Sequence, residues 1–131
     1  MRLLILSLII LSSQSCSKKD VGLNTGWNML SHVENNDTIS YVYFPNTFTP
    51  NGDGSNDIFK IIGQGMEYNN LDFKIFKKSG ENIFVTTNYN IGWDGTYKGI
   101  KAASGIYYFK LTAEDTSQYV YHSEGSLYLL Q

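Results

Sequence analysis

Residues 48–59 constrain the fold of this chain more than any other stretch. They read Phe-Thr-Pro-Asn-Gly-Asp-Gly-Ser-Asn-Asp-Ile-Phe, so one proline, two glycines, two aspartates and two asparagines lie between the terminal phenylalanines. Gly52 and Gly54 permit positive φ, Pro50 fixes φ, and Asn and Asp side chains bond to nearby backbone. A helix or a regular strand does not accommodate turn-forming residues at this density. The stretch is therefore the corner of a β-domain, an ion site, or both.

Short apolar stretches separated by turn residues lie on both sides of this corner. The pattern is clearest after Gly105, where alternate residues from Tyr107 to Ala113 are apolar on one face. The expected strands are residues 41–44, 58–62, 71–76, 81–87, 105–113, 118–123 and 126–130, with turns at 68–70, 77–80 and 114–117. About seven short strands at this spacing predict an all-β sandwich.

Composition fits a β-domain and excludes several classes of function. The 131 residues suffice for one domain, 15% of them are aromatic and only 17% are charged. The formal net charge is −2, and without the first 15 residues it becomes −3, from 9 lysines and 12 acidic residues. Arg2 is the only arginine and no basic stripe exists, so nucleic acid is not an expected partner. The single cysteine, Cys16, excludes an internal disulfide.

Residues 1–15 have the pattern of an export signal. A short positive start precedes residues 3–11, which are apolar except for Ser7 and are too few to span a bilayer. Cys16 follows a few small polar residues, as the lipidated cysteine does in bacterial lipoprotein signals. Ser13 occupies the position where that pattern has an aliphatic residue, so an ordinary secretory signal cleaved nearby stays the alternative. Lipidation at Cys16 would attach the chain to a membrane through a lipid anchor.

Residues 16–40 are interpreted as the lipidated cysteine and a tether. Residues 17–20, Ser-Lys-Lys-Asp, resemble the short Lys-acidic tag of surface-exposed Bacteroidetes lipoproteins. The spacing of Trp27, Leu30 and Val33 allows one helical turn, which the polar residues 35–37 would end. The expected organisation is thus a signal at 1–15, a tether at 16–40 and a β-domain at 41–131.

Four oxygen-bearing side chains in the corner alternate as the ligands of short calcium loops do: Asn51, Asp53, Ser55 and Asp57. The EF-hand template does not fit, because the sixth position counted from Asn51 is asparagine and the twelfth is isoleucine. The alternative is that these side chains cap a turn opened by the two glycines. Calcium is the one candidate cofactor, and turn capping is the favoured interpretation.

The sequence gives little support to an enzyme. Its only histidines are His32, in the expected tether, and His122, on a late strand. No serine or cysteine lies in a nucleophile motif, and there is neither a phosphate loop nor His/Cys metal spacing. Trp93 is expected to be a buried plug between the sheets, followed by a turn at Asp94-Gly95. A non-enzymatic function is therefore predicted.

Five short sequence motifs, here called blocks, lie within residues 44–130. They are Phe-Thr-Pro-Asn-Gly-Asp-Gly-x-Asn-Asp at 48–57, a hairpin at 71–84, Trp-Asp-Gly-Thr-Tyr-Lys-Gly at 93–99, Gly-Ile-Tyr-Tyr at 105–108 and Gly-x-Leu-x-Leu at 125–129. In this order they resemble the gliding-motility-associated C-terminal domain, the type B sorting domain of the Bacteroidetes type IX secretion system. The resemblance implies an immunoglobulin-like sandwich of about seven antiparallel strands, read by the secretion machinery at the end of a cargo protein. The motif residues it implies are Phe48, Pro50, Gly52, Gly54, Trp93, Asp94, Gly95, Gly99, Gly105 and Tyr107.

One block departs from the family pattern. The family hairpin carries Asn-Arg-Trp-Gly, whereas residues 77–80 of this chain are Lys-Lys-Ser-Gly. Signal, tether and domain account for the sequence, so no cargo region is expected within it.

The leading functional hypothesis is a non-enzymatic lipoprotein module of the outer membrane, exposed at the cell surface. It would act through contacts with envelope or secretion-machinery proteins. One alternative is a genuine sorting signal separated from its cargo, and another is a calcium-dependent adhesion or glycan-binding module.

Overall fold

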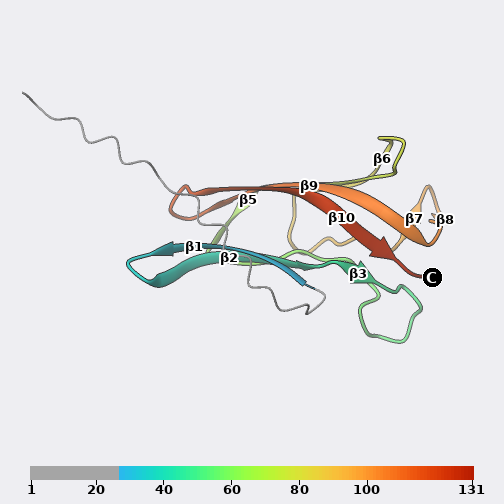
Figure 1. Cartoon of the computed structure of the whole chain (residues 1–131), viewed down its shortest axis with the longest axis horizontal. Coiled ribbons are helices and arrows are strands. Elements are labelled where there is room, and N and C mark those ends of the chain that lie inside the picture. Colours follow the sequence, from blue (N-terminus) through green and yellow to red (C-terminus); the bar gives the residue numbers. More distant parts are fainter. Residues whose placement is uncertain (1–26) are drawn as a thin grey trace, which may run out of the picture.

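Two β-sheets lie face to face and form a sandwich (Figure 1). The computed structural model describes residues 27–131. Within that range every regular element is a strand. The strands are β1 (Trp27–Glu34), β2 (Asp37–Pro45), β3 (Thr47–Phe48), β4 (Ile62–Gln64), β5 (Met66–Phe76), β6 (Asn82–Thr86), β7 (Thr96–Tyr97), β8 (Ile100–Lys101), β9 (Gly105–Asp115) and β10 (Val120–Leu129).

One sheet contains three strands in the order β1-β2-β4, and the other contains five in the order β3-β10-β9-β5-β6. Strands β7 and β8 form a separate two-stranded ribbon. Every strand pair is antiparallel except β3 and β10, which are parallel. The predicted all-β sandwich is confirmed, but the described residues contain more strands than the seven expected, and one pair is parallel.

Alternation along β9 supplies one wall of the core. Tyr107, Phe109, Leu111 and Ala113 are all buried, as the period-two pattern predicted. Phe109 meets Phe44 of the facing sheet edge-on, with ring centroids 5.0 Å apart. Such aromatic pairs add to the hydrophobic gain of about 25 cal/mol per Å² of apolar surface removed from water. The core therefore lies between β2 and the central strands of the five-stranded sheet.

The N-terminal part of the sandwich extends further than the predicted domain boundary at residue 41. Residues 27–34 form β1, not a tether or a helical turn, and β1 pairs with β2 along its whole length. Asn35 and Asn36 connect them with φ of 51° and 69°. Two consecutive residues of positive φ make the type I′ turn that matches strand twist, and asparagine tolerates this conformation. The polar pair thus forms a hairpin turn.

Strand β10 is continuous, although Gly125 was expected to separate two strands at 118–123 and 126–130. Gly125 lies opposite Phe109 in the antiparallel register. A Cβ on Gly125 would be 3.1 Å from the Phe109 ring, so the ring occupies the space that a side chain would fill. The glycine is a packing site within the strand, and not a break.

Two further predictions about strands were wrong. A strand was expected at 58–62, but residues 58–61 are irregular apart from one bridge between Phe59 and Trp93, and the strand in this region is β4, which begins at Ile62. Residues 68–70 lie inside β5, where a register shift between Met66 and Leu71 accommodates them. A bulge absorbs extra residues without ending a strand, which a period-two pattern does not reveal.

Candidate functional site

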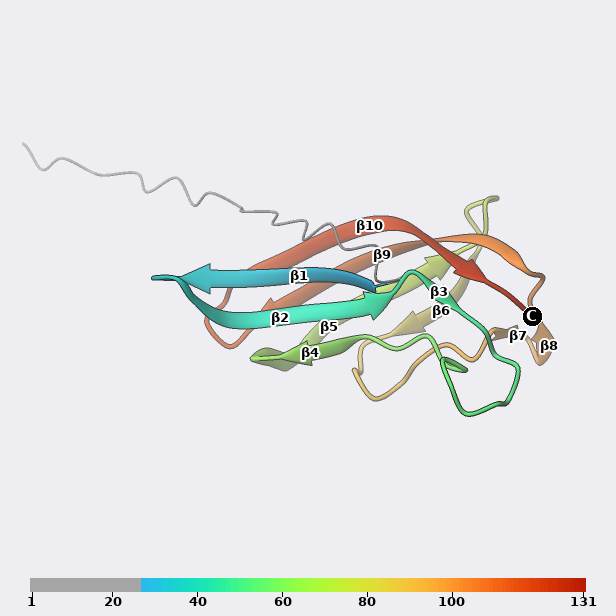
Figure 2. The same ribbon diagram turned by 60° about the horizontal axis from the view of Figure 1, so that its bottom comes forward.

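The corner loop between β3 and β4 is held by its own carboxylates. Asp57 accepts hydrogen bonds from the backbone N–H of Gly52 and of Gly54, each at 2.7 Å. Both glycines have positive φ, 80° and 84°, with open space where a Cβ would be. The glycines are therefore required by backbone conformation and not by crowding. The loop projects from the body of the sandwich on the side of β3 (Figure 2).

Asp53 is the second carboxylate of this loop. Its Oδ1 accepts the N–H of Ser55 at 2.8 Å, and its Oδ2 accepts the amide of Asn51 at 2.9 Å. These bonds lower the pKa of Asp53 below its ordinary value. Of the four predicted calcium ligands, Asn51 and Asp53 thus contact each other through their side chains, Asp57 binds the loop backbone, and Ser55 takes part through its own backbone.

These hydrogen bonds are those of a capped turn. In residues 27–131 no group of three or more His, Cys, Asp or Glu side chains is arranged to hold a metal. The calcium hypothesis stays a prediction.

Trp93 occupies the centre of the sandwich end next to this loop. It is 1% exposed, and its indole N–H donates to the carbonyl of Thr96 at 2.8 Å. Its ring centroid lies 5.3 Å from that of Phe48 and 5.2 Å from that of Tyr107. Three residues from three separate sequence blocks therefore pack together as one aromatic cluster.

The turn after Trp93 brings more of the motif residues to the same end. Asp94 accepts both the N–H and the hydroxyl of Thr96, which lowers its pKa. Gly95 has φ of 79°, and a Cβ there would lie 2.8 Å from Pro50. Its carbonyl accepts the side-chain amide of Gln131 at 3.2 Å. The corner loop, the Trp93 turn and the end of β10 are thus fastened to one another.

Gly99 and Gly105 complete this arrangement. Gly99 follows Lys98 in the turn between β7 and β8, where both residues have positive φ. Gly105 begins β9 with φ of 152°. Both glycines therefore set backbone direction around the Trp93 cluster.

A buried carboxylate that the sequence did not single out joins the two sheets. Asp115 is 1% exposed, and its Oδ1 accepts the N–H of Ser117 at 2.8 Å and that of Tyr119 at 2.9 Å. Its Oδ2 accepts the hydroxyl of Ser40 at 2.5 Å and Nδ1–H of His32 at 2.8 Å. Burial alone would raise the pKa of Asp115, but the hydrogen bonds outweigh it and hold the pKa well below its usual range.

This cluster does not have the geometry of a catalytic triad. In a triad the imidazole lies between the nucleophile and the carboxylate. Here Ser40 and His32 both bind the same oxygen of Asp115, and Ser40 is 1% exposed. The imidazole of His32 also stacks on Tyr119, with ring centroids 4.1 Å apart. The cluster therefore fastens β1 and β2 to the β9–β10 turn.

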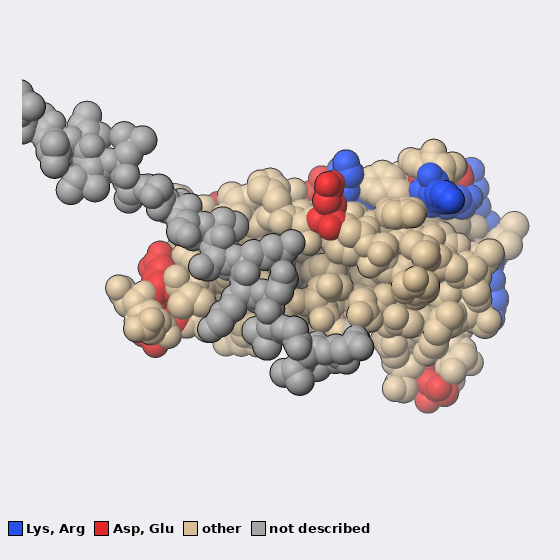
Figure 3. Space-filling view, viewed as in Figure 1, with Lys and Arg blue, Asp and Glu red and all other residues tan. Residues whose placement is uncertain are grey.

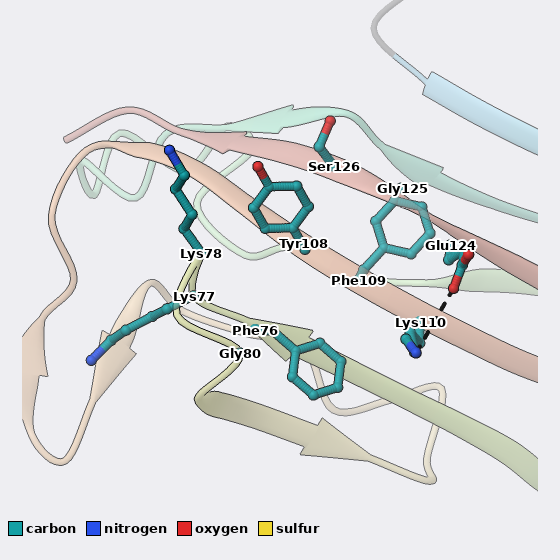
Figure 4. A pocket seen from close by; sticks show the side chains of 10 residues that line it. All are labelled: Phe76, Lys77, Lys78, Gly80, Tyr108, Phe109, Lys110, Glu124, Gly125 and Ser126. Carbon is teal, nitrogen blue, oxygen red and sulfur yellow. Dashed lines mark ion pairs between the residues drawn. The ribbon is translucent and has the colours of Figure 1, made fainter.

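A groove of about 760 Å³ opens on the outer face of the five-stranded sheet (Figure 4). It lies beside the β5–β6 hairpin, at the block that departs from the family pattern. Its lining includes Phe76, Lys77, Lys78, Tyr108, Lys110 and Glu124. The groove is thus an accessible concave surface with both apolar and charged groups.

Lysines gather at the end of the molecule that carries this hairpin and the β7–β8 ribbon (Figure 3). Lys77 and Lys98 lie on the ring of Tyr97, each with Nζ 4.9 Å from its centroid. Glu81 binds Lys77 at 2.7 Å and accepts the hydroxyl of Tyr97 at 3.0 Å. These contacts hold the ribbon against the hairpin and place positive charge next to the groove.

Exposed aromatic side chains mark the outer face of the three-stranded sheet. The Trp27 and Tyr43 ring centroids are 5.3 Å apart, and Trp27 is 46% exposed. Trp27 also lines a second groove, of about 590 Å³, with Asn56 and Lys60. This face combines apolar rings with mostly uncharged polar groups.

Cys16, the predicted lipidation site, lies outside the described residues. Among residues 27–131, no helix has the length and apolar character needed to cross a membrane.

Comparison with known proteins gives one family match. A family model described as CHU_C Type IX secretion signal domain matches residues 42–129. The match runs from within β2 to the end of β10, so β1 lies outside it. No curated protein matches the chain.

Proposed function

The chain belongs to the type IX secretion signal domain family, and from this premise we propose that it is a non-enzymatic cell-surface module that acts through protein–protein contacts in the envelope. Membership confirms the resemblance expected from its five blocks and identifies the chain as an exported protein. The family is one of secretion signals and not of catalysts. A secretion signal works by being recognised, so the exposed surfaces of the domain would carry its function.

The observation that carries the proposal is that motif residues pack against one another inside the domain. Phe48, Trp93 and Tyr107 pack into one cluster, and Pro50 lies against Gly95. These residues stabilise the domain and offer no exposed reactive group. The exposed faces would then be the surfaces that are recognised. This favours contacts with other proteins over catalysis.

The polar clusters also support a non-enzymatic function. The carboxylate oxygens of Asp115 and Asp57 accept hydrogen bonds from donors within the domain itself. Catalytic acids and bases instead need access to a substrate atom within hydrogen-bond reach. A buried carboxylate that accepts several hydrogen bonds instead holds parts of the fold together.

A lipid on Cys16 would keep the domain close to the membrane. Residues 17–26 separate Cys16 from β1, and ten residues span at most about 36 Å when fully extended. The anchor would thus place the sandwich within reach of other outer-membrane proteins. Lipoproteins carry several acyl chains, enough for stable attachment.

A second candidate function is that of a sorting signal for a passenger protein, and the family description favours it directly. The two candidates share recognition by the export machinery. They differ in whether the domain acts for itself or for a passenger.

The experiment that tests the proposal tracks the full chain in cells with and without a functional type IX system. We expect protease added to intact cells to digest the chain only when the system is present. Cys16→Ala should move the chain from the membrane fraction to the soluble fraction. Surface exposure that is the same without the system would contradict the proposed export route, and unchanged membrane association of Cys16→Ala would contradict the anchor.

A further inference from the structure

The groove beside the β5–β6 hairpin has features of a docking site for a charged segment. We propose that it binds an acidic polypeptide segment of a partner protein, one whose carboxylates flank an apolar side chain. The inference deepens the proposed function, because it rests on contacts with envelope proteins and gives the chemistry of the segment. Three observations carry it: the charge of the groove, its floor and the position of its one acid.

Charge in the groove is opposite to that of the molecule around it. Residues 27–131 contain seven lysines and eleven acidic residues, a net charge of −4. Three of the seven lysines, Lys77, Lys78 and Lys110, line this groove. A local excess of positive charge on an anionic protein attracts an anionic segment and orients it during encounter.

The lysines differ in how far they are already neutralised. Lys77 is held by Glu81 at 2.7 Å, whereas no ion pair or hydrogen bond joins Lys78 to another residue of the described chain. Lys110 lies 3.9 Å from Glu124, and both side chains are more than two-thirds exposed. An exposed pair at this separation is weak. Lys78 and Lys110 are therefore the two cations able to receive a carboxylate.

Aromatic side chains form the floor between these cations. Phe76 of β5 and Tyr108 of β9 are register partners on adjacent strands, and Tyr108 pairs on its other side with Ser126 of β10. Tyr108 is 42% exposed, and its ring stands between Lys78 and Ser126 (Figure 4). Tyrosine at the centre of a concave patch is favoured at protein interfaces, because it offers apolar area and a hydroxyl together.

Glu124 decides which class of anion fits. A polyanion such as a sulfated polysaccharide, or an anionic membrane, would place several negative charges across the groove and beside Glu124. A polypeptide can put carboxylates on Lys78 and Lys110, lay an apolar side chain on Tyr108, and offer an N–H donor to Glu124. Mixed charge around an apolar floor is the pattern that discriminates among segments by repulsion as well as attraction.

The test uses the full chain in mild detergent, labelled for amide NMR, with three peptide probes. The first is acetyl-Glu-Phe-Glu-Leu-Glu-amide, the second carries Gln for every Glu, and the third carries Lys for every Glu. We expect the acidic peptide alone to shift amide resonances, confined to the β5–β6 hairpin and the facing parts of β9 and β10. Lys78→Glu and Lys110→Glu should each weaken binding by about fivefold or more, in line with exposed charge pairs, and added salt should weaken it further.

Matched variants separate recognition from general charge. Lys60→Glu makes the same change at an exposed lysine of the other groove and should leave affinity unchanged. Glu124→Gln should tighten binding, and Tyr108→Ala should weaken it. Thermal melts of each variant check that the fold is retained, since all these side chains are exposed.

Several outcomes would overturn the docking proposal. Equal binding of the acidic and Gln peptides would contradict a role for charge. Amide resonance shifts at residues outside the groove would contradict the proposed site. If a sulfated oligosaccharide or an anionic vesicle binds at these residues and the acidic peptide does not, the groove is a polyanion site. If the acidic peptide does not bind this groove while export still depends on the type IX system, only the docking proposal is wrong. If export does not depend on that system, only the proposed function is wrong.

Discussion

His32 and Asp115 are 83 positions apart in the chain, and His32 Nδ1 lies 2.8 Å from Asp115 Oδ2. The contact joins β1 of one sheet to the end of β9 in the other. Ser40 of β2 binds the same carboxylate oxygen at 2.5 Å. The first hairpin is thus fastened to the body of the domain by a buried polar cluster as well as by strand pairing.

Asp115→Ala should lower the free energy of unfolding by roughly 3–5 kcal/mol. The substitution leaves buried donors without their acceptor, and breaking a buried charged hydrogen-bond network has costs of this order. Urea unfolding of the full chain measures the change. A loss below about 1 kcal/mol would mean that the cluster is not a fastening.

The same carboxylate predicts the direction of acid sensitivity. The pKa of Asp115 is held below its usual range, so the folded state binds this proton less readily than the unfolded chain does. Its stabilisation is complete above the unfolded pKa, about 3.9, and is lost as pH falls from there towards the folded pKa. The stability difference between the protein and Asp115→Asn should therefore shrink progressively below about pH 4. A difference that is constant from neutral pH to pH 2 would contradict the assigned shift.

Trp93→Ala should cost about 3–5 kcal/mol of stability, because a large buried ring leaves a cavity that its neighbours only partly fill. Its partners Phe48 and Tyr107 come from other blocks of the motif, so the loss extends across the whole end of the sandwich. Ile100→Ala is the control, since Ile100 is 72% exposed and should change stability by less than about 0.5 kcal/mol. Similar effects of the two substitutions would place Trp93 outside the core.

Calcium should leave the melting temperature of the protein unchanged up to millimolar concentration. The Asp57 carboxylate already accepts two backbone N–H groups, and Asp53 accepts two further donors. Asp53→Asn with Asp57→Asn should lower the melting temperature slightly, because both substitutions weaken the capping bonds of the loop. A metal site would behave differently: calcium would raise the melting temperature by linkage, and the double variant would abolish that rise.

The sequence predicted well those parts of the fold whose signal is local. Alternation from Tyr107 to Ala113 identified β9 and its buried face, and Gly80, with φ of 87°, lies in the predicted hairpin turn. In both cases the pattern and the structure depend on neighbouring residues alone. The two-layer sandwich results from repeating such strands at short spacing.

The errors arise where a distant residue decides the outcome. Gly125 resembles a strand break until Phe109, on the partner strand, is seen to cover it. Asn35 and Asn36 suit the end of a helical turn as well as a type I′ hairpin, and only pairing with β2 distinguishes the two. Local pattern carries no information about either partner.

The candidate site was predictable only in part, for the same reason. The turn-forming character of the corner could be inferred from its own side chains, and the burial of Trp93 from its size. The Asp115 cluster could not, because its serine, histidine and carboxylate come from separate strands and have no shared periodicity. The groove depends on side chains of β5, β9 and β10 that meet only through sheet register.

Recognition of this domain by the type IX system, which both candidate functions require, is measured by the fraction of a passenger protein displayed at the cell surface. A reporter with its own signal peptide is fused ahead of residues 27–131 and measured on intact cells that have or lack the system. We expect surface display only with both the domain and the system present, and reduced display with Trp93→Ala because the domain is destabilised. Equal display without residues 27–131, or retention inside cells with an intact system, would contradict it.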